Sequence, residues 1–268
     1  MLLKKKVVLD IHENYHRIIK SRSSNRVRAS ASIFLYRLYE KICFSCATAI
    51  VCAVPDISNN YKNFKIKKEE IKNFPEIKPF PLKTSKTATT TFIYVGEVSE
   101  ERGILEAVKA FEMVLREGYR VELKLIGPMK IDKKSIAHAI QNEHIEMTGF
   151  LNREDVFRYI RRSDVGLCLL HPKENFLNSY PVKIFEYMAC GIPVIASDFD
   201  TFKNFIERNH CGFNLDPFDI RRVASTMVYF IKHPTKAKAM GANGIKMIRE
   251  RYNWDIEKSK LLQLYKNL

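Results

Sequence analysis

From residue 91 to the end of the chain, short runs of β-branched and apolar residues alternate with longer amphipathic segments. This alternation is typical of a doubly wound α/β domain, in which helices cover a parallel sheet. The predicted strands are Thr91–Val95, Val121–Ile126, Ile145–Thr148, Val165–Leu170, Val194–Ala196 and Gly212–Leu215. The predicted helices are Ile104–Leu115, Lys133–Gln141, Arg153–Arg161, Val182–Met188 and Thr201–Arg208, with three more that begin near Asp219, Thr235 and Trp254.

The residues before this domain predict only part of a second α/β unit. Val7–Leu9 and Ala49–Ala53 are predicted strands, Ile33–Phe44 is a predicted helix, and Pro55 suits the first turn of another helix. The segment Pro75–Thr90, rich in Pro, Lys and Thr, is the predicted linker. We therefore expect three parts: a partial domain with its linker (1–80), a complete domain (81–250) and a terminal helix that crosses back to the first part (251–268).

Positive charge is concentrated in the first third of the chain. The net charge is +15, and residues 1–90 hold 18 Lys and Arg against 7 Asp and Glu, which is +11. A basic surface attracts any polyanion, so an anionic membrane, a pyrophosphate-bearing lipid and nucleic acid are candidate partners. A solvated basic face without a partner explains the charge equally well.

Neither a membrane span nor a secretory signal is predicted. No apolar run approaches the roughly 20 residues that cross a bilayer, and the apolar stretch after Lys4-Lys5-Lys6 is too short for a signal peptide. We therefore expect a cytoplasmic protein. Cys43 and Cys46 have the spacing of a redox or zinc pair, but no second pair or nearby histidine accompanies them. Reduced thiols and no metal site are expected.

The most informative segment is Asn178–Ser197, with the sequence NSYPVKIFEYMACGIPVIAS. Pro181 suits the first turn of a helix, whose positive end is a natural seat for a diphosphate. Lys183 adds a full charge within that turn, and Glu186, three residues later, falls on the same helix face. A carboxylate there can accept hydrogen bonds from both hydroxyls of a ribose, as in dinucleotide-binding folds.

This segment resembles the E-x7-E region of family 4 glycosyltransferases, a large retaining group with the GT-B fold. The resemblance implies that Glu186 holds the ribose of a nucleotide sugar. Asn178 stands at the first glutamate position, so the resemblance implies that Asn178, with Ser179 and Tyr180, contacts the transferred sugar. This departure leaves the identity of the donor sugar open.

The resemblance extends through the rest of the complete domain. Arg102 matches a phosphate-binding lysine of the family, whereas Glu97 stands where many members carry a second phosphate-binding cation. The resemblance therefore implies that Lys183 and Arg102 neutralise the diphosphate between them. Phe150 lies in a loop that matches the one around the base.

The first part of the chain resembles the family only in pieces. Val8–Glu13 is similar to the D-x-H-E segment of the N-terminal domain, which implies that His12 lines the acceptor side of the transferred sugar. Ala47–Ile57 and Asn73–Pro75 resemble two later stretches of that domain. Roughly half of the family's N-terminal domain precedes the histidine strand and has no counterpart here. The resemblance therefore implies an N-terminally truncated enzyme.

The implied activity is transfer of a sugar from a nucleoside diphosphate to a lipid-linked or polysaccharide acceptor in lipopolysaccharide, capsule or exopolysaccharide assembly. The resemblance also implies retention of configuration and no metal or other cofactor, at the inner face of the cytoplasmic membrane. One alternative is a module that binds nucleotide sugars without turnover, as a remnant or as half of a split enzyme. A basic nucleic-acid-binding protein is a third interpretation, and its binding would collapse with added salt. His171 and Asp164 are expected to be structural rather than an acid/base pair.

Overall fold

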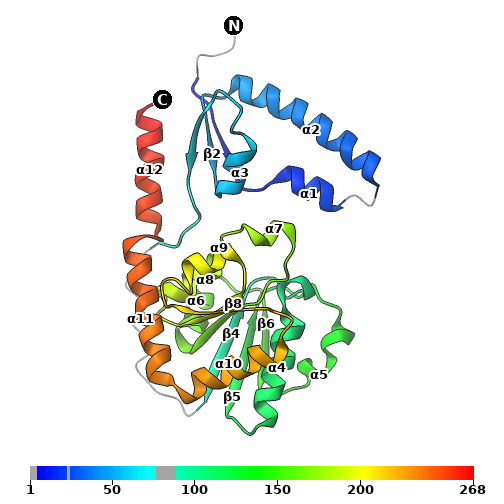
Figure 1. Ribbon diagram of the computed structural model, residues 1–268, viewed down its shortest axis with the longest axis vertical. Helices are drawn as coiled ribbons and strands as arrows, with labels where there is room; N and C mark the ends of the chain where they lie inside the picture. Colours follow the sequence, from blue (N-terminus) through cyan, green and yellow to red (C-terminus); the bar gives the residue numbers. More distant parts are fainter. Residues whose placement is uncertain (1–4, 23–24, 77–88) are drawn as a thin grey trace. The chain divides into compact units, whose positions relative to one another are not determined.

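The computed structural model describes residues 5–22, 25–76 and 89–268 of the chain (Figure 1). The chain divides into two units. The first contains the described residues up to Phe74, with Asn178–Tyr180 and Trp254–Leu268, and the second contains Pro75–Leu177 and Pro181–Asn253. Most of the predicted linker, Pro75–Thr90, and its predicted boundary at residue 80 lie outside the described residues.

The first unit is built on a small parallel sheet with the strand order β1-β2-β3. Its strands are β1 (Val8–Ile11), β2 (Ala49–Cys52) and β3 (Lys67–Glu70). Its helices are α1 (Tyr15–Arg22), α2 (Arg26–Cys46), α3 (Pro55–Asn60) and α12 (Trp254–Lys266). Among the described residues of the chain, no helix is long and apolar enough to cross a membrane.

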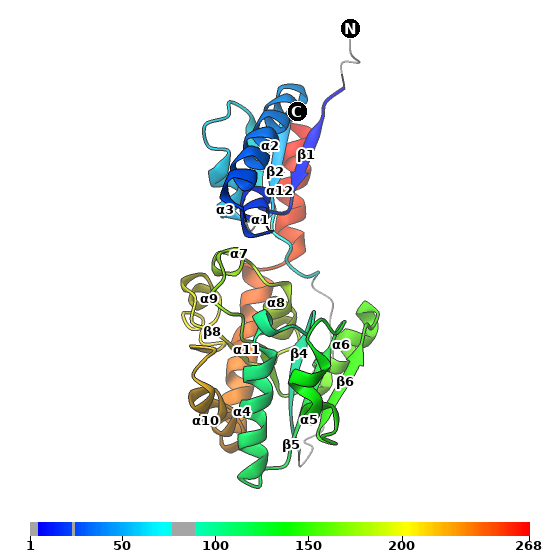
Figure 2. The same ribbon diagram turned by 90° about the vertical axis from the view of Figure 1, so that its right-hand side faces the viewer.

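Both faces of the small sheet are covered, because successive side chains of a strand point in opposite directions. On one face, Ile50 of β2 packs with Phe44 of α2. On the other face, Val51 of β2 packs with Leu264 of α12, and Figure 2 shows α12 in red beside this sheet. The last helix of the chain therefore belongs to the fold of the first unit.

Three elements of the first unit differ from the predictions: α1 and β3 were not predicted, and α2 begins earlier than predicted. Helix α2 begins seven residues before the predicted start at Ile33, where the Asn25 side chain accepts hydrogen bonds from the backbone N–H groups of Val27 and Arg28. Strand β3 was not predicted, since its sequence KKEE is wholly charged. It forms because its backbone pairs with β2 at the edge of the sheet.

The second unit contains a six-stranded parallel sheet with the order β6-β5-β4-β7-β8-β9. Every neighbouring pair of strands is parallel. The strands are β4 (Thr90–Val95), β5 (Val121–Ile126), β6 (Ile145–Gly149), β7 (Val165–Cys168), β8 (Val194–Ser197) and β9 (Gly212–Leu215). The predicted doubly wound α/β class is confirmed, with β7 ending two residues earlier than predicted.

The helices of the second unit lie between and after these strands. They are η1 (Glu100–Arg102), α4 (Ile104–Arg116), η2 (Lys133–Ile136), α5 (Ala137–Ile140), α6 (Arg153–Arg162), α7 (Glu174–Leu177), α8 (Val182–Ala189), α9 (Asp200–Phe205), α10 (Ile220–Lys232) and α11 (Pro234–Glu250). The predicted helix Lys133–Gln141 is a 3₁₀ turn followed by a short α-helix, because the backbone at Ile136 is not helical (φ −124°, ψ 21°).

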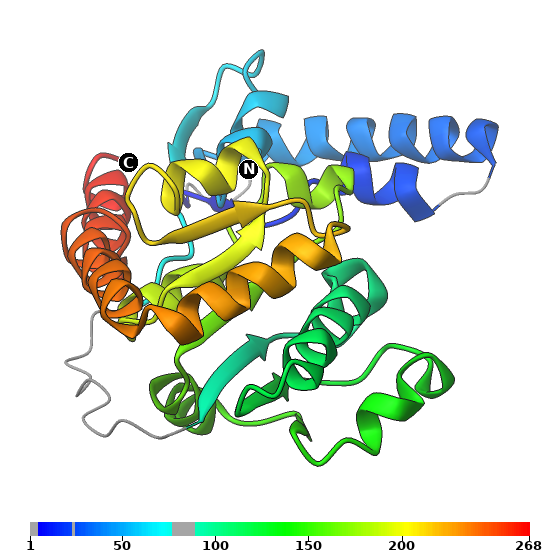
Figure 3. The same ribbon diagram turned by 60° about the horizontal axis from the view of Figure 1, so that its bottom comes forward.

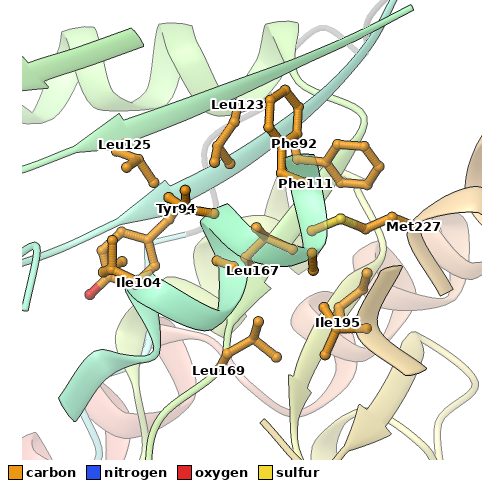
Figure 4. Close-up of a cluster of buried hydrophobic side chains, with 14 of the residues drawn as sticks. Phe92, Tyr94, Ile104, Phe111, Leu123, Leu125, Leu167, Leu169, Ile195 and Met227 are labelled. Atoms are coloured by element: carbon orange, nitrogen blue, oxygen red, sulfur yellow. The ribbon is translucent and has the colours of Figure 1, made fainter. Parts of the chain in front are cut away.

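The core of the second unit lies between the sheet and the helices α4 and α10. Phe92 and Tyr94 of β4 point to this face, where they meet Phe111 of α4 and Met227 of α10 (Figure 4). Figure 3 shows α4 and α10 side by side on the sheet. Ile93 lies between the two aromatic residues in sequence and is also fully buried, so the opposite face of β4 is covered too.

Candidate functional site

The sheet of the second unit has a topological switch point between β4 and β7. Strands β5 and β6 are added on one side of β4, whereas β8 and β9 are added beyond β7 on the other side. The loops after β4 and β7 therefore leave the sheet in opposite directions at its carboxyl edge. Open parallel sheets bind their ligands in the crevice at such a point.

Lys183 is a buried ammonium in the first turn of α8, and 8% of the residue is exposed. Its Nζ lies 3.9 Å from the ring centroid of Tyr94 and has no hydrogen-bond partner among the described residues. Burial lowers the pKa of Lys183 to about 8, and the positive charge of Arg102 lowers it in the same direction. A buried charge that lacks an anion is unfavourable by itself, so this arrangement favours an anionic ligand.

Arg102 ends the 3₁₀ turn η1 that follows β4. Its Nε is buried without a hydrogen-bond partner among the described residues and lies 3.8 Å from Oε1 of Glu97, while another part of the side chain hydrogen-bonds with Tyr94. The guanidinium carbon lies 5.6 Å from the ring centroid of Phe176. Arg102 and Lys183 thus act on each other as like charges, and an anion bound between them would relieve that repulsion.

The fold holds α8 against the carboxyl edge of the sheet through Tyr187. The Tyr187 hydroxyl accepts a hydrogen bond from the backbone N–H of Val95 (2.9 Å) and donates to the carbonyl of Leu167 (3.4 Å). A Cβ atom at Gly166 of β7 would lie 2.3 Å from the Tyr187 ring. The absence of a side chain at Gly166 therefore allows the first turn of α8 to lie beside the end of β4.

Glu186 lies one turn after Lys183 on α8, as predicted. Burial raises its pKa, and the positive charges of Arg153 and Lys183 oppose that rise. Arg153, the first residue of α6, was not among the predicted site residues. The sequence feature that could have identified Arg153 is its position four residues after Gly149, just beyond a predicted binding loop.

Phe150 directly follows β6, at the carboxyl end of that strand. Its side chain is 82% exposed, which excludes a place in the core. Gly149 before it has φ 69°, in the left-handed region. An aromatic face held open to solvent can stack on a planar base, and the site role of Phe150 stays a prediction.

The other predicted site residues belong to the first unit. Asn178 is exposed, and Ser179 and Tyr180 are half-buried. Nε2 of His12 lies 3.0 Å from Oδ2 of Asp10, and its Nδ1 lies 3.2 Å from the amide nitrogen of Asn73. Both ring nitrogens of His12 therefore have partners within their own unit.

His171 and Asp164 do not pair with each other. Nε2 of His171 lies 3.1 Å from Oε2 of Glu106, and the ring centroids of His171 and Phe218 are 4.6 Å apart, with the ring planes tilted by 45°. The Asp164 carboxylate instead accepts a hydrogen bond from the backbone N–H of Thr91 (2.9 Å). The structural interpretation of these two residues agrees with these contacts.

We expect a methyl group at Gly96 to disrupt the cation site. Gly96 follows β4 with φ 132°, and a Cβ atom there would lie 2.8 Å from Nζ of Lys183. Gly96→Ala should therefore weaken the binding of a diphosphate ligand at least about tenfold, which isothermal titration calorimetry would measure. Gly118→Ala is the matched control, because Gly118 also has a positive φ (85°) but has no atom within 4 Å of a built Cβ. Equal losses in both variants would contradict this prediction.

Comparison with known proteins places this chain in a family. The model of the family "Glycosyl transferases group 1" matches residues 78–247. The capsular polysaccharide biosynthesis glycosyltransferase CapM of Staphylococcus aureus is 23% identical over 253 residues, which cover 87% of this chain and 65% of CapM. The chain thus spans just under two thirds of the length of CapM.

Solved structures share the fold. Sucrose-phosphate synthase from Thermosynechococcus elongatus has a TM-score of 0.73 at 17% identity, with 99% of this chain and 68% of that chain covered. HepE from Anabaena, in complex with UDP and glucose, has a TM-score of 0.74 at 14% identity, with 99% and 72% covered. The fold is therefore the GT-B type with parallel sheets. Because the family model matches more than half of the sequence, the chain belongs to the glycosyl transferases group 1.

Proposed function

We propose that this chain binds a nucleoside diphosphate sugar and transfers the sugar to a lipid-linked or polysaccharide acceptor in cell-surface glycan assembly. The observation that carries the proposal is the buried Lys183 ammonium, which has no hydrogen-bond partner among the described residues and is repelled by Arg102. A diphosphate offers several oxygens to both cations at once. CapM, named for capsular polysaccharide biosynthesis, and HepE, solved with UDP and glucose, support this class of reaction.

The spacing on α8 supports a nucleotide rather than a simple anion. Lys183 and Glu186 are three residues apart, so their backbones are separated by about 4.5 Å along the helix axis. In a nucleoside diphosphate, the ribose is next to the phosphates. Glu186 can therefore accept hydrogen bonds from the ribose hydroxyls while Lys183 contacts the diphosphate. We further propose that Phe150 stacks on the base and that Asn178, Ser179 and Tyr180 contact the sugar.

In the proposed reaction, the bond between the anomeric carbon and the diphosphate oxygen breaks as the acceptor oxygen bonds to that carbon, and the proton of the acceptor hydroxyl passes to an oxygen of the leaving diphosphate. Negative charge then builds on the leaving diphosphate, where Lys183 and Arg102 would stabilise it. These two cations supply the charge that a metal ion supplies in other transferases, so we propose that no metal is required. Retention of configuration, in the manner of family 4, is part of the proposal.

A thermal-shift screen of UDP-, GDP- and ADP-sugars, with and without EDTA, tests donor binding. A ligand that binds only the folded chain stabilises it by about 2.7 kcal/mol at a hundredfold excess over its Kd. We expect one nucleotide to raise the melting temperature by roughly 5–10 °C, because each kcal/mol gives about 2–4 °C in a domain of this size. EDTA should leave that shift unchanged. No shift with any of the nucleotide sugars would overturn the proposal.

Binding without turnover is a second candidate, and the contacts of His12 favour it. Both ring nitrogens of His12 are engaged, by Asp10 and Asn73, so His12 must give up one of these contacts to assist an acceptor. Release of the nucleoside diphosphate from a bound donor, in the presence of a membrane glycolipid extract, separates the two candidates. Multiple turnovers per chain indicate the transferase, whereas a thermal shift with no released diphosphate indicates the binding module.

A further inference from the structure

Helix α2 presents a row of large apolar side chains to solvent. Six of its residues are between 51% and 79% exposed: Val27, Phe34, Leu35, Leu38, Tyr39 and Ile42. Val27, Phe34, Leu38 and Ile42 form a row together with Ala31. Successive members of this row are three or four residues apart, the spacing that places side chains on one helix face. We call the six residues the α2 apolar face.

The α2 apolar face is distinct from the face that packs within the first unit. Ala29, Glu40 and Phe44 are buried, and Ile33 and Tyr36 between them are half-buried. This second row is offset by two residues, or about 200° around the helix, from the exposed row. Helix α2 is therefore apolar on two opposite sides, and only one of them is covered, by α1 and, at Phe44, by the sheet. An apolar surface of this extent is typical of an interaction site.

The charges around this face have one sign. Residues 15–46 contain seven Lys and Arg and one acidic residue, Glu40. Glu40 points inward, where it accepts a hydrogen bond from the Tyr61 hydroxyl (2.6 Å) and lies 2.8 Å from Nε2 of His16. Arg37 and Lys41, four residues apart, are exposed along one margin of the face, and Arg28 is exposed on the other margin. The solvent-facing charge of α2 is therefore wholly positive in the described residues.

We propose that the α2 apolar face docks on the surface of a lipid bilayer that contains anionic lipids. A helix with an apolar face and basic margins lies in the plane of a bilayer, with its apolar side chains among the acyl chains and its cations at the headgroups. A second copy of the chain fits less well, because two such faces together would align basic margins that have no acidic side chain to pair with them. This inference does not depend on the donor site.

Vesicle co-sedimentation of the full chain tests the proposal. One set of vesicles is phosphatidylcholine alone, and in the other set one lipid in three is phosphatidylglycerol. We expect the chain to partition at least about tenfold more strongly onto the anionic vesicles, since each basic group near an anionic surface favours binding several-fold. Added salt should reduce this preference, because it screens the charges.

Two double variants with matched controls separate the apolar and the charged contributions. Phe34→Ser with Leu38→Ser should weaken binding to the anionic vesicles about 30-fold or more, and Arg37→Gln with Lys41→Gln about 30-fold. The controls lie on α12 of the same unit: Leu262→Ser with Tyr265→Ser, which are 51% and 56% exposed, and Lys258→Gln with Lys266→Gln, which are also exposed. All these side chains face solvent, so the fold and the response to donors should be unchanged.

Three outcomes would overturn the proposal. The first is no binding to anionic vesicles, and the second is equal binding to both vesicle types. The third is an equal loss of binding in the α12 controls. Sedimentation velocity identifies a competing occupant: a dimer that Phe34→Ser with Leu38→Ser converts to a monomer, without vesicle binding, would assign the α2 apolar face to a second copy.

Discussion

Lys183→Met is expected to abolish donor binding while making the chain more stable. The ammonium is the only part of the side chain that can contact a diphosphate, and a hydrogen bond to a charged group contributes about 1.5–3 kcal/mol. With a contact to each phosphate, the loss should be on the order of 100-fold or more in affinity. Calorimetric titration with the nucleotide sugar that gives the largest thermal shift would measure it.

The gain in stability follows from the burial of Lys183 without an anion. Burial lowers its pKa from 10.5 to about 8, and each pKa unit corresponds to about 1.4 kcal/mol. The folded state therefore carries a penalty of about 3 kcal/mol at neutral pH, which a methionine of similar volume would remove. Denaturant unfolding of the ligand-free chain should show a higher free energy of unfolding in the variant.

Lys109→Met provides the control for this prediction. Lys109 is an exposed lysine of α4 in the same unit, so its replacement should change neither stability nor donor affinity appreciably. A Lys183→Met variant that is less stable than the wild type would show that contacts within the folded chain, such as the one with the Tyr94 ring, already compensate the burial of the ammonium. The interpretation of the cation pair as an anion site would then be wrong.

The same burial gives a pH dependence of defined sign. The folded state loses the Lys183 proton near pH 8, whereas the unfolded chain keeps it to about pH 10.5. Since the unfolded state binds more protons in this window, the free energy of unfolding should rise between about pH 8 and 10, and Lys183→Met should lack this rise. Donor affinity should fall over the same window, by up to tenfold per pH unit, because the neutral amine no longer attracts the diphosphate.

Glu186→Ala is expected to weaken nucleotide-sugar binding by one to two orders of magnitude. The carboxylate would accept hydrogen bonds from the ribose hydroxyls, and their removal costs roughly 1.5–3 kcal/mol. The loss should appear with UDP or another nucleotide alone as well as with the full donor, since the ribose is common to both. A free diphosphate should bind the variant as tightly as it binds the wild type.

Glu117→Ala is the matched control, because Glu117 is exposed at the end of α4. Burial raises the pKa of Glu186 above its usual value, so the folded state holds its proton to a higher pH than the unfolded chain does. The free energy of unfolding of the ligand-free chain should therefore decrease as the pH rises above about 4.5, the ordinary pKa of a glutamate. Glu186→Gln should remove that decrease. Unchanged nucleotide affinity in Glu186→Ala would rule out the proposed ribose contact.

The local features of the site could be predicted from the sequence. Pro181 at a helix start, with Lys183 and Glu186 three residues apart, places a cation and a carboxylate on one helix face wherever that helix lies. The strand periods from β4 to β9 are likewise properties of short segments, and the predicted parallel domain was confirmed. Helical rise and strand alternation determine these arrangements within a few residues, so they do not depend on the rest of the fold.

The tertiary structure decided which distant residues meet. Tyr94 and Lys183 are far apart in sequence, yet Nζ of Lys183 lies 3.9 Å from the ring centroid of Tyr94. They meet because β4 and β7 are neighbours at the switch point and because Tyr187 holds α8 against these strands. The polar strand β3 exists only through its pairing with β2, and α12 covers the small sheet although most of the chain separates them. The α2 apolar face likewise required the structure, because an apolar helix sequence is compatible with burial on both sides. Such contacts depend on strand order and on packing between distant segments, and no local pattern in the sequence encodes them.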